Sequence, residues 1–390
     1  MAYRIMKLPQ HGMYIPNMAT TMKDIADHLG LSVVTVSKVL RDHPDISEGT
    51  RERVLRYVKE VNYEPSIVAR SLVTGRSFLV GLIVPDLLHP FFAEVAKELS
   101  STIRSKGYSL IVSSSEEDAD MEQREIRHLR ARRLDALVIA STRTEIPPID
   151  PLFEKGETVV FLDRQLPGIA TNYVGTDDIA AGRIATEHLI DIGCKRIAHI
   201  RGRDNSTGVH RFEGYRRALK AHNLQFNPEY VISRMHVDTQ SIEEGAEAMR
   251  LLLNRDPQPD GVFCYNDPLA IGAMNAIFDA GLKIPDDIAL IGCGNLHYDS
   301  CLRVPLSSIN QHSQRIGQKA GKLVLSLIES KQQPVPKSYV LRPELVVRAS
   351  SQRDKMNESR RGRTLLATSS SNIKVTAPAA VRSRRRKNEG

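Results

Sequence analysis

The sequence of 390 residues has little of what marks several large classes of protein. No apolar run reaches the roughly 18 residues of a transmembrane helix, and residues 1–20 contain no apolar run of signal-peptide length. The four cysteines form no C-x-x-C pair and no paired spacing, so we expect neither a disulfide framework nor a zinc site. We therefore expect a cytoplasmic protein with reduced thiols and no membrane-spanning segment.

Common catalytic and cofactor motifs are also absent. The chain has no G-x-S-x-G, no G-x-x-x-x-G-K-[ST], no H-E-x-x-H and no G-x-G-x-x-G after a strand. We therefore expect a protein that is not an enzyme and that has no cofactor, catalytic residue or metal ligand. Two alternatives stay open because α/β folds host many chemistries: an enzyme, and a ligand-binding or transport receptor.

Charge is distributed unevenly along the chain, whose formal net charge is +8. Residues 1–77 carry 11 Lys/Arg and 8 Asp/Glu, residues 78–350 carry 32 and 35, and residues 351–390 carry 11 and 3. A small basic head, a slightly acidic body and a basic tail are typical of a head that binds a polyanion and a body with a different task.

Three short helices are predicted in residues 21–64. Each follows a residue suited to the N-cap position: Thr21, Ser32 and Ser47. Gly30 separates the first two helices because glycine accepts an unusual backbone angle. This order is the layout of a helix-turn-helix, whose second helix places its N-terminal side chains in the major groove of DNA. Two helices joined by a glycine turn also occur in ordinary protein cores, so the pattern alone leaves both interpretations open.

From Phe78 onward, short apolar runs alternate with amphipathic helical patterns. The runs are FLVGLIV, YSLIV, LDALVIA, TVVFLD, RIAHI, GVFCY and IALIG. This alternation predicts βαβ units, with parallel sheets covered by helices on both faces. The predicted fold class is an N-terminal all-α helix-turn-helix head followed by an α/β body of two parallel-sheet lobes. Residues 1–20 are expected to be a disordered leader, with Met18 or Met22 as possible true starts, and residues 350–390 a disordered basic tail.

Residues 21–76 closely resemble the head of the lactose-repressor/galactose-repressor family of bacterial transcription regulators. TMKDIADHLGLSVVTVSKVL and NYEPSIVARSL match the family's D-[IV]-A, [VL]-S-x-x-T-V-S-[RK]-V-[LV] and N-Y-x-P-x-x-x-A-x-x-L in the family's order. The resemblance continues to about residue 349, some 85% of the chain. It implies a DNA-binding domain over residues 21–64, a hinge helix and linker over residues 65–76, and a periplasmic-binding-protein-like body over residues 77–349. Within the body it implies a first lobe of about 77–176 plus 308–334, and a second lobe of about 177–306 plus 335–349.

The resemblance places DNA contacts at the start of the first helix, on the recognition helix and in the hinge helix. The residues are Thr21, Ser32, Val33, Val34, Thr35, Ser37, Lys38, Ala69, Arg70 and Leu72. Lys38 can donate to guanine and valine methyl groups can pack on a thymine methyl, whereas Ser32, Thr35 and Ser37 suit phosphates. Burial in the core is the alternative for the two valines and the expectation for Val36.

Leu72 lies in the segment that resembles the hinge helix, which is too short to hold a helix alone in water. In this family, a leucine at this position wedges into a central base step from the minor groove, and unstacking by an apolar wedge is a known way to kink DNA. An ordinary linker with a buried leucine is the alternative.

The resemblance also implies a small-molecule effector, a sugar or sugar derivative, bound between the lobes at the carboxyl ends of strands. The candidate contacts are Asp86, Phe91, Phe92, Asp163, Arg164, Asn205, Thr207, Arg211, Asn266 and Asp267. Phe91 and Phe92 match an aromatic platform of the family, although core burial is the common fate of such residues. Arg211 can clamp two ligand oxygens. Asp163–Arg164 and Asn266–Asp267 can instead be helix caps or ion pairs between the lobes.

The sequence departs from the family after the strand IALIG. The family commonly has an acidic residue there, whereas this chain has Cys293 and Gly294. The change removes two strong hydrogen-bond acceptors from the expected pocket. An unusual sugar, a phosphorylated ligand and a different class of effector therefore stay open.

The mechanism that the resemblance implies is a homodimer on a palindromic double-stranded DNA operator. The effector would change the arrangement of the lobes about three crossover strands, near Gly175, Ser307 and Pro334, and so the operator affinity. The tail lacks the leucine heptads that tetramerise some relatives. Its basic cluster at residues 383–387 suits non-specific nucleic-acid binding, with a solvated tail as the alternative.

Overall fold

The computed structural model describes residues 20–40, 42–63, 71, 74–144, 157–166, 168, 170–330 and 335–353. The chain divides into two compact units, Met1–Ser77 and Phe78–Gly390. We call them the head and the body and describe each by itself. No helix within the described ranges has the length and apolarity needed to cross a membrane.

The head contains the three predicted helices, α1 (Met22–Leu29), α2 (Val33–Leu40) and α3 (Glu48–Glu60). Thr21 and Asp24 form a reciprocal capping box, in which each side chain accepts the other residue's backbone N–H, at 2.7 and 3.2 Å. Gly30 ends α1 in the left-handed conformation, at φ +64°, and Ser32 Oγ accepts the N–H of Thr35 at 3.0 Å. These three features confirm the predicted helix–turn–helix start.

The predicted cap at Ser47 is wrong in its detail. Ser47 occupies the N-cap position of α3, but its side chain accepts no capping hydrogen bond. Its hydroxyl pairs instead with the Thr50 hydroxyl at 2.9 Å. The three helices share one small core of buried side chains, namely Ile25, Ala26, Val36, Val39 and Val54.

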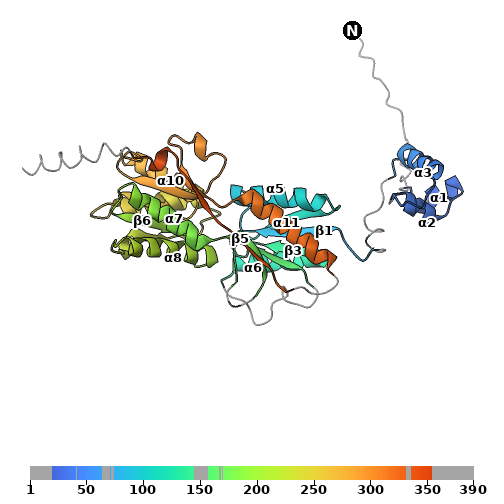
Figure 1. Cartoon of the computed structure of the whole chain (residues 1–390), viewed down its shortest axis with the longest axis horizontal. Helices are drawn as coiled ribbons and strands as arrows, with labels where there is room; N and C mark the ends of the chain where they lie inside the picture. Colours follow the sequence, from blue (N-terminus) through green and yellow to red (C-terminus); the bar gives the residue numbers. More distant parts are fainter. Residues whose placement is uncertain are drawn as a thin grey trace, which may run out of the picture. The chain divides into compact units, whose positions relative to one another are not determined.

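The body consists of two lobes, each built on a six-stranded sheet (Figure 1). The first sheet contains β1 (Leu79–Val84), β2 (Ser109–Ser114), β3 (Ala136–Ile139), β4 (Val159–Leu162), β5 (Asn172–Thr176) and β11 (Ser338–Leu341), in the order β11-β5-β4-β3-β1-β2. The second contains β6 (Ile197–Arg201), β7 (Val231–Ser233), β8 (Gly261–Cys264), β9 (Ala289–Gly294), β10 (Ser307–Asn310) and β12 (Glu344–Val346), in the order β12-β10-β9-β8-β6-β7. All neighbouring strands pair in parallel except β10 and β12, so the predicted fold class is confirmed.

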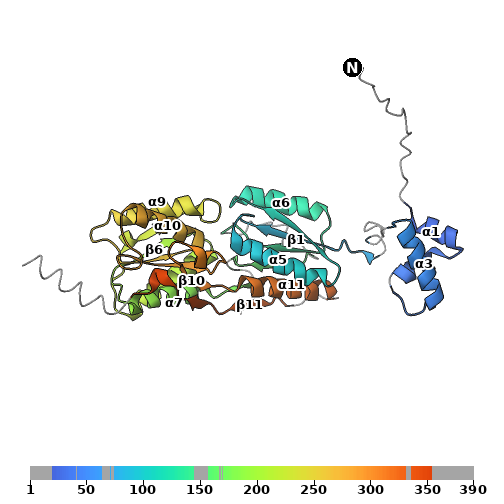
Figure 2. The ribbon, with the colours of Figure 1, turned by 90° about the horizontal axis from the view of Figure 1, so that it is seen from above.

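Helices cover both faces of each sheet. In the first lobe, α5 (Pro90–Arg104) and α11 (Ser313–Glu329) share a core with one face, and α6 (Ala119–Ala131) covers the other. In the second lobe, α9 (Ser241–Leu253) and α10 (Asp267–Asp279) cover one face, and α7 (Asp178–Asp191) and α8 (Ser206–Ala221) the other. Figure 2 shows β1 between α6 and the α5–α11 pair. The body's other elements within the described residues are three short 3₁₀ turns, Pro228–Tyr230, Asp299–Cys301 and Ala349–Ser351.

The chain crosses between the lobes three times: after β5, between β10 and α11, and between β11 and β12. Two boundaries therefore differ from the prediction. β10 belongs to the second sheet as far as Asn310, and β11 belongs to the first sheet, so residues 338–341 lie in the first lobe. Pro334, near which the third crossing was expected, lies outside the described residues. β11 and β12 contain no buried residue, unlike the four-residue strands β3, β4 and β8, so they lack the apolar run by which a strand is recognised.

Candidate functional site

The start of α2 presents apolar side chains on the surface of the head. Val33 is 43% exposed and Val34 is 64% exposed, whereas Val36 is fully buried. Of the two alternatives left open by the sequence, burial therefore applies to Val36 and exposure to the other two valines. Exposed valines at the first turn of the second helix are available to contact another molecule.

Polar side chains surround these valines. The hydroxyl groups of Ser32 and Thr35 lie 2.8 Å apart, and Lys38 Nζ lies 3.3 Å from Asp45 Oδ2 in a solvent-exposed ion pair. An exposed pair of this kind contributes little to stability, so Lys38 can exchange Asp45 for another acceptor. Ser37 lies on the same helix and Thr21 in the capping box of α1. Ala69, Arg70 and Leu72 lie outside the described residues.

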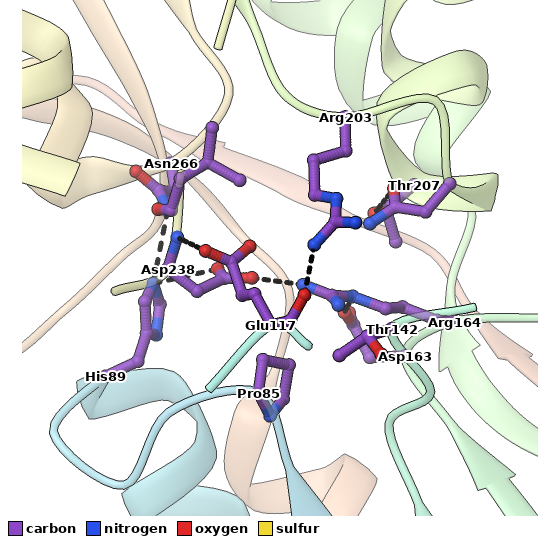
Figure 3. A network of polar contacts seen from close by, with 12 residues as sticks. Pro85, His89, Glu117, Thr142, Asp163, Arg164, Arg203, Thr207, Asp238 and Asn266 are labelled. Atoms are coloured by element: carbon purple, nitrogen blue, oxygen red, sulfur yellow. Dashed lines mark hydrogen bonds and ion pairs between the residues drawn. The ribbon is translucent and has the colours of Figure 1, made fainter. Parts of the chain in front are cut away.

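A polar site lies between the two lobes of the body, at the carboxyl ends of the strands (Figure 3). The strand order places β1 between β2 and β3, and β6 between β7 and β8, which is the switch point where ligands bind in open α/β sheets. The segments after β1, β2 and β4 of the first lobe and after β6, β7 and β8 of the second supply the side chains that meet across the lobes. We call this region the interlobe site, defined by His89, Glu117, Asp163, Arg164, Arg203, Asp238 and Asn266.

Arg164 and Asp238 form a buried ion pair across the interlobe site. Arg164 follows β4 of the first lobe, Asp238 follows β7 of the second, and Arg164 Nη2 donates to Asp238 Oδ2. Their side chains are only 2% and 4% exposed. Burial alone would raise the pKa of Asp238, but the Arg164 guanidinium holds it below its usual value. Arg164 is thus used in an ion pair between the lobes, which was one of the two predicted alternatives.

Glu117 supports this pair from the first lobe. Its Oε2 accepts a hydrogen bond from the Thr239 hydroxyl at 3.0 Å and lies 3.3 and 3.4 Å from the backbone N–H groups of Asp238 and Thr239. Its backbone carbonyl accepts a hydrogen bond from Arg203 Nη1 at 2.6 Å. Burial, and then the nearby Asp238 carboxylate, raise the pKa of Glu117 to about 7.

His89 and Asn266 make a second contact between the lobes. Asn266 Nδ2 lies 3.3 Å from His89 Nε2 and donates to the Val237 carbonyl at 2.7 Å. The other end of the Asn266 side chain caps α10, because its Oδ1 accepts the Leu269 N–H at 2.9 Å. Burial lowers the pKa of His89 and so favours the neutral imidazole; the tautomer with its proton on Nδ1 can accept this hydrogen bond at Nε2.

Two residues of the interlobe site have backbones in the left-handed region. Asp163 has φ +62° and Glu117 has φ +55°, a conformation that is uncommon outside glycine. Such strain gathers at functional sites because the surrounding structure must hold it in place. Asp163 is 5% exposed, and burial raises its pKa.

Arg211, a predicted ligand clamp, is bound to partners within its own lobe. Its Nε donates to Asp178 Oδ1 at 2.8 Å, its Nη1 donates to the Tyr265 carbonyl at 2.6 Å, and its guanidinium lies 4.6 Å from the centre of the Tyr265 ring. All these partners belong to the second lobe. Arg211 therefore acts first as a buried brace between α7, α8 and the end of β8.

Asn205 and Thr207 also hold the start of α8. Asn205 Oδ1 accepts from the Gly208 N–H at 2.9 Å and from the Thr207 hydroxyl at 2.8 Å. The Thr207 hydroxyl lies 2.8 Å from the Tyr265 hydroxyl. Both residues are buried at the interlobe edge of the second sheet.

The aromatic pair at the start of α5 packs inward. Phe91 and Phe92 are each 3% exposed, meet edge to face at 5.1 Å, and belong to the core of the first lobe. The core alternative therefore describes them. Asp86, just before them, accepts the Leu88 N–H at 2.9 Å, and burial raises its pKa.

Asp267 takes a position that the sequence did not predict. Its carboxylate accepts the Ser308 hydroxyl at 2.6 Å and the Leu296 N–H at 3.2 Å, and a Cβ at Gly294 would lie 2.7 Å from it. The space beside the end of β9, where the sequence has Cys293 and Gly294 and no acidic residue, thus contains a carboxylate that comes from α10. Nearby Asp299 is fully buried, and burial together with Asp267 raises the pKa of Asp299 to about 9.

Several buried polar atoms of this region have no hydrogen-bond partner among the residues that the structure describes. They are Glu117 Oε1, Asp163 Oδ1, His89 Nδ1, Arg164 Nε and Asn205 Nδ2. Leaving buried polar atoms unpaired is unfavourable. The set includes both donors and acceptors, so it matches a ligand that offers both.

The sequence prediction missed Glu117, Asp238, Arg203 and the interlobe role of His89. Glu117 follows a predicted strand, YSLIV, so the rule that ligands meet strand ends would have found it. Asp238 follows β7, which has only three residues and gives no periodic signal. An open pocket of about 520 Å³ adjoins the site, lined by residues of both lobes that include Leu88, His89, Asp238, Ile242, Ile271, Tyr298 and Leu302.

The comparisons with known proteins agree over both units. Residues 21–66 match "Bacterial regulatory proteins, lacI family", and residues 77–343 match "Periplasmic binding proteins and sugar binding domain of LacI family". The chain is 33% identical over 335 residues to the HTH-type transcriptional repressor PurR of Histophilus somni strain 129Pt, covering 85% of this chain and 98% of that protein. It is 31% identical to the ribose operon repressor of Halalkalibacterium halodurans, covering 87% and 99%.

Solved structures share this fold. The Lac repressor dimer bound to operator and the anti-inducer ONPF is 26% identical, with a TM-score of 0.74, and covers 86% of this chain and 100% of that one. The complex of the transcriptional regulator CelR with cellobiose is 28% identical, with a TM-score of 0.63, and covers 85% and 99%.

Proposed function

This chain belongs to the LacI family of bacterial regulatory proteins, and we propose how its two units work as an effector-controlled DNA-binding repressor. In this proposal, α2 of the head reads the operator, and the interlobe site of the body binds a neutral carbohydrate effector. The observation that carries the second part is the group of unpartnered buried polar atoms between the lobes. The protein then acts by binding in the cytoplasm and not by catalysis, in keeping with its relatives, which are repressors.

The DNA-reading role rests on the exposed start of α2. Val33 and Val34 offer methyl groups for thymine, and Lys38 offers an ammonium group for guanine. Ser32, Thr35 and Ser37 suit phosphate oxygens, with Thr21 at the neighbouring helix start. These roles combine the exposure of the side chains with the family's mode of binding.

The hinge segment supplies a second DNA contact in this proposal. Ala69, Arg70 and Leu72 follow the family's hinge-helix pattern in the sequence. Leu72 would insert into the minor groove at the centre of the operator and kink it. A palindromic operator with a flexible central step, such as TA or CA, fits this mode of binding.

The charge of the interlobe site favours a neutral effector. Among the described residues, Asp86, Glu117, Asp163 and Asp238 share this region with the guanidinium groups of Arg164, Arg203 and Arg211, and Arg211 is already paired with a further carboxylate, that of Asp178. A phosphorylated ligand would add negative charge to a region with an excess of carboxylates, which is unfavourable in a buried site. Hydroxyl groups donate and accept at once, so a polyhydroxyl compound matches the mixed set of unpartnered atoms.

We further propose that the protein is a homodimer. Each repressor subunit then reads one half of the palindrome, as the symmetry of a dimer requires. The structural neighbour bound to operator is a dimer.

The first experiment is the selection of binding sites for the full-length protein from random double-stranded DNA. A palindrome with a kinkable central step is the expected result, and enrichment of no sequence would overturn the proposed role of α2. With the site in hand, operator binding is titrated against free sugars, their phosphates and purine bases. An effect of a phosphate or a purine, but of no free sugar, would refute the proposed class of effector.

A further inference from the structure

Asp238 places its carboxylate inside the interlobe site, against side chains of the first lobe. It comes from the second lobe, yet its carboxylate contacts Arg164 of the first lobe, and His89 Nε2 lies 3.7 Å from its other oxygen. Figure 3 shows Asp238 between His89, Glu117 and Arg164. Its backbone N–H also points to Glu117 Oε2, at 3.3 Å.

The contacts of Asp238 join the two lobes at one point. Arg164, His89 and Glu117 belong to three separate loops of the first lobe, after β4, β1 and β2. If the lobes separate, the ion pair between Arg164 and Asp238 breaks and both charged groups become hydrated. A buried ion pair costs much to break while it stays buried, so the lobes either stay together or open far enough to hydrate both charges.

Other buried ion pairs of the body have a different geometry. Glu122 accepts from Arg143, Ser141 and Thr142, all within the first lobe. Asp178 pairs with Arg211 within the second. These pairs stabilise one lobe each, whereas the Arg164–Asp238 pair joins one lobe to the other and borders the unpartnered atoms of Glu117 and Asp163.

We propose that Asp238 is a built-in occupant of the interlobe site, which holds the lobes together in the absence of an effector and which an effector must displace from Arg164. This inference rests on the proposed function, in that it places the effector at Arg164. It adds that the unliganded repressor already has joined lobes. The net free energy of effector binding is therefore the difference between the free energy of the effector's own contacts and that of the Asp238 contacts it displaces.

The Asp238→Asn variant tests this proposal, with hydrogen exchange of the full-length protein as the measurement. The amides of Asp238 and Thr239 donate to Glu117 across the lobes, so amide exchange in segment 236–241 reports on this contact directly. Segment 114–119 contains the acceptor Glu117 and gains access to water when the lobes separate. We expect exchange in both segments to rise about tenfold or more, since loss of the charge pair favours separation of the lobes. Exchange equal to that of the unchanged protein would overturn the proposal.

Glu122→Gln is the matched control, because it weakens a buried ion pair inside a single lobe. It should lower the stability of the first lobe without raising exchange at 236–241. If it raises exchange there as much as Asp238→Asn does, the effect is general destabilisation and the proposal is wrong.

Thr239→Val is the second test variant should Asp238→Asn fail to fold, since it removes a neutral contact to Glu117 between the lobes. It should raise exchange in the same two segments by a smaller factor, and an unchanged rate would count against the proposal.

The exchange measurement involves neither DNA nor effector, so its failure is distinct from a failure of the proposed function. If an operator is recovered but amide exchange in Asp238→Asn is unchanged, only the proposal that Asp238 holds the lobes together is disproved. If exchange in that variant is faster but no operator is selected, only the proposed DNA-reading role of α2 is disproved.

Discussion

Ser308 of β10 donates its hydroxyl hydrogen to Asp267 Oδ1 at 2.6 Å, which joins the first turn of α10 to a strand that leads into a crossing between the lobes. The same carboxylate accepts the Leu296 N–H from the loop after β9. Asp267 therefore links the site end of the second lobe to the segment about which the lobes must rearrange. Its carboxylate is committed to protein partners, and the bare backbone of Gly292 and Gly294 makes room for it.

Gly294→Ala should destabilise the protein more than a Gly→Ala replacement whose only cost is the strained backbone angle, with no atom close to the added Cβ. Gly294 has φ +146°, and an added Cβ would lie 2.7 Å from Asp267 Oδ2. We expect a loss of about 2–4 kcal/mol in the free energy of unfolding. Gly281→Ala is the control, with φ +73° and no atom within 4 Å of the added Cβ, for which we expect about 1 kcal/mol. Equal losses in urea unfolding would show that the Asp267 contact is unimportant.

Val34→Ser should weaken operator binding and leave the fold intact. Val34 is 64% exposed, so its replacement should change the free energy of unfolding by less than about 0.5 kcal/mol. The loss of a methyl contact in the groove should reduce operator affinity by roughly five- to tenfold. Val36→Ala is the contrasting variant, because Val36 is fully buried, and it should cost about 1–3 kcal/mol of stability. Fluorescence anisotropy and thermal unfolding measure the two effects, and full affinity in Val34→Ser would argue against a base contact.

Leu72→Ala should separate specific from non-specific DNA binding. If Leu72 is the wedge, its loss should weaken binding to the operator by tenfold or more, on the order of 1–3 kcal/mol. Binding to random DNA depends on phosphate contacts and should hardly change. Titrations of both DNAs at one salt concentration give the answer, and equal losses on the two would contradict the wedge.

Glu117→Gln should change how stability depends on pH. In the folded protein the pKa of Glu117 is raised from 4.5 to about 7, so the folded state binds more protons than the unfolded state between these values. The stability that Glu117 contributes is fully present below pH 4.5, falls as the pH rises to about 7, and is constant above that. From pH 5 to 7.5 the unchanged protein should lose roughly 1–3 kcal/mol more than Glu117→Gln.

The comparison of the two proteins isolates Glu117 from its charged neighbours. His89, whose pKa is lowered by burial, acts with the opposite sign, and Asp86, Asp163, Asp238, Arg164 and Arg203 also face this region. All of them are present in both proteins. Unfolding by urea at a series of pH values measures the difference, and parallel pH profiles would show that Glu117 keeps its ordinary pKa.

Removal of the tail should affect stability only if it reaches Arg353. Arg353 donates from Nη2 to the Asp260 carbonyl at 2.6 Å, from Nε to the Pro285 carbonyl at 2.8 Å, and from Nη1 to Cys194 Sγ at 3.1 Å. Deletion of residues 354–390 should leave the thermal midpoint unchanged, whereas deletion of residues 353–390, which also removes Arg353, should cost about 1–3 kcal/mol. The shorter deletion then allows a clean test of the basic cluster: the dependence of DNA affinity on salt should become less steep if that cluster binds phosphate, and an unchanged slope would assign it no role.

Local rules of the chain were enough to predict the head and the class of the body. Capping residues such as Thr21 and Ser32, the turn at Gly30 and the apolar runs of the central strands depend on neighbours a few positions away. For the same reason the resemblance to the family was visible in the motifs of residues 21–76. The ends of well-predicted strands located Asp163, Arg164, Asn205 and Asn266 near one another.

The partners of these residues depend on contacts between distant segments, and no local pattern encodes them. Arg164 and Asp238 are 74 positions apart and Glu117 and Thr239 are 122 apart, so only the folded body shows that they meet. Likewise, Arg211 is committed to Asp178 and Tyr265, and Asp267 fills the space beside Gly294. Burial and charge in the interlobe site arise where the loops at the carboxyl ends of the two sheets meet, and the sum of those contacts decides which side chains remain free for an effector.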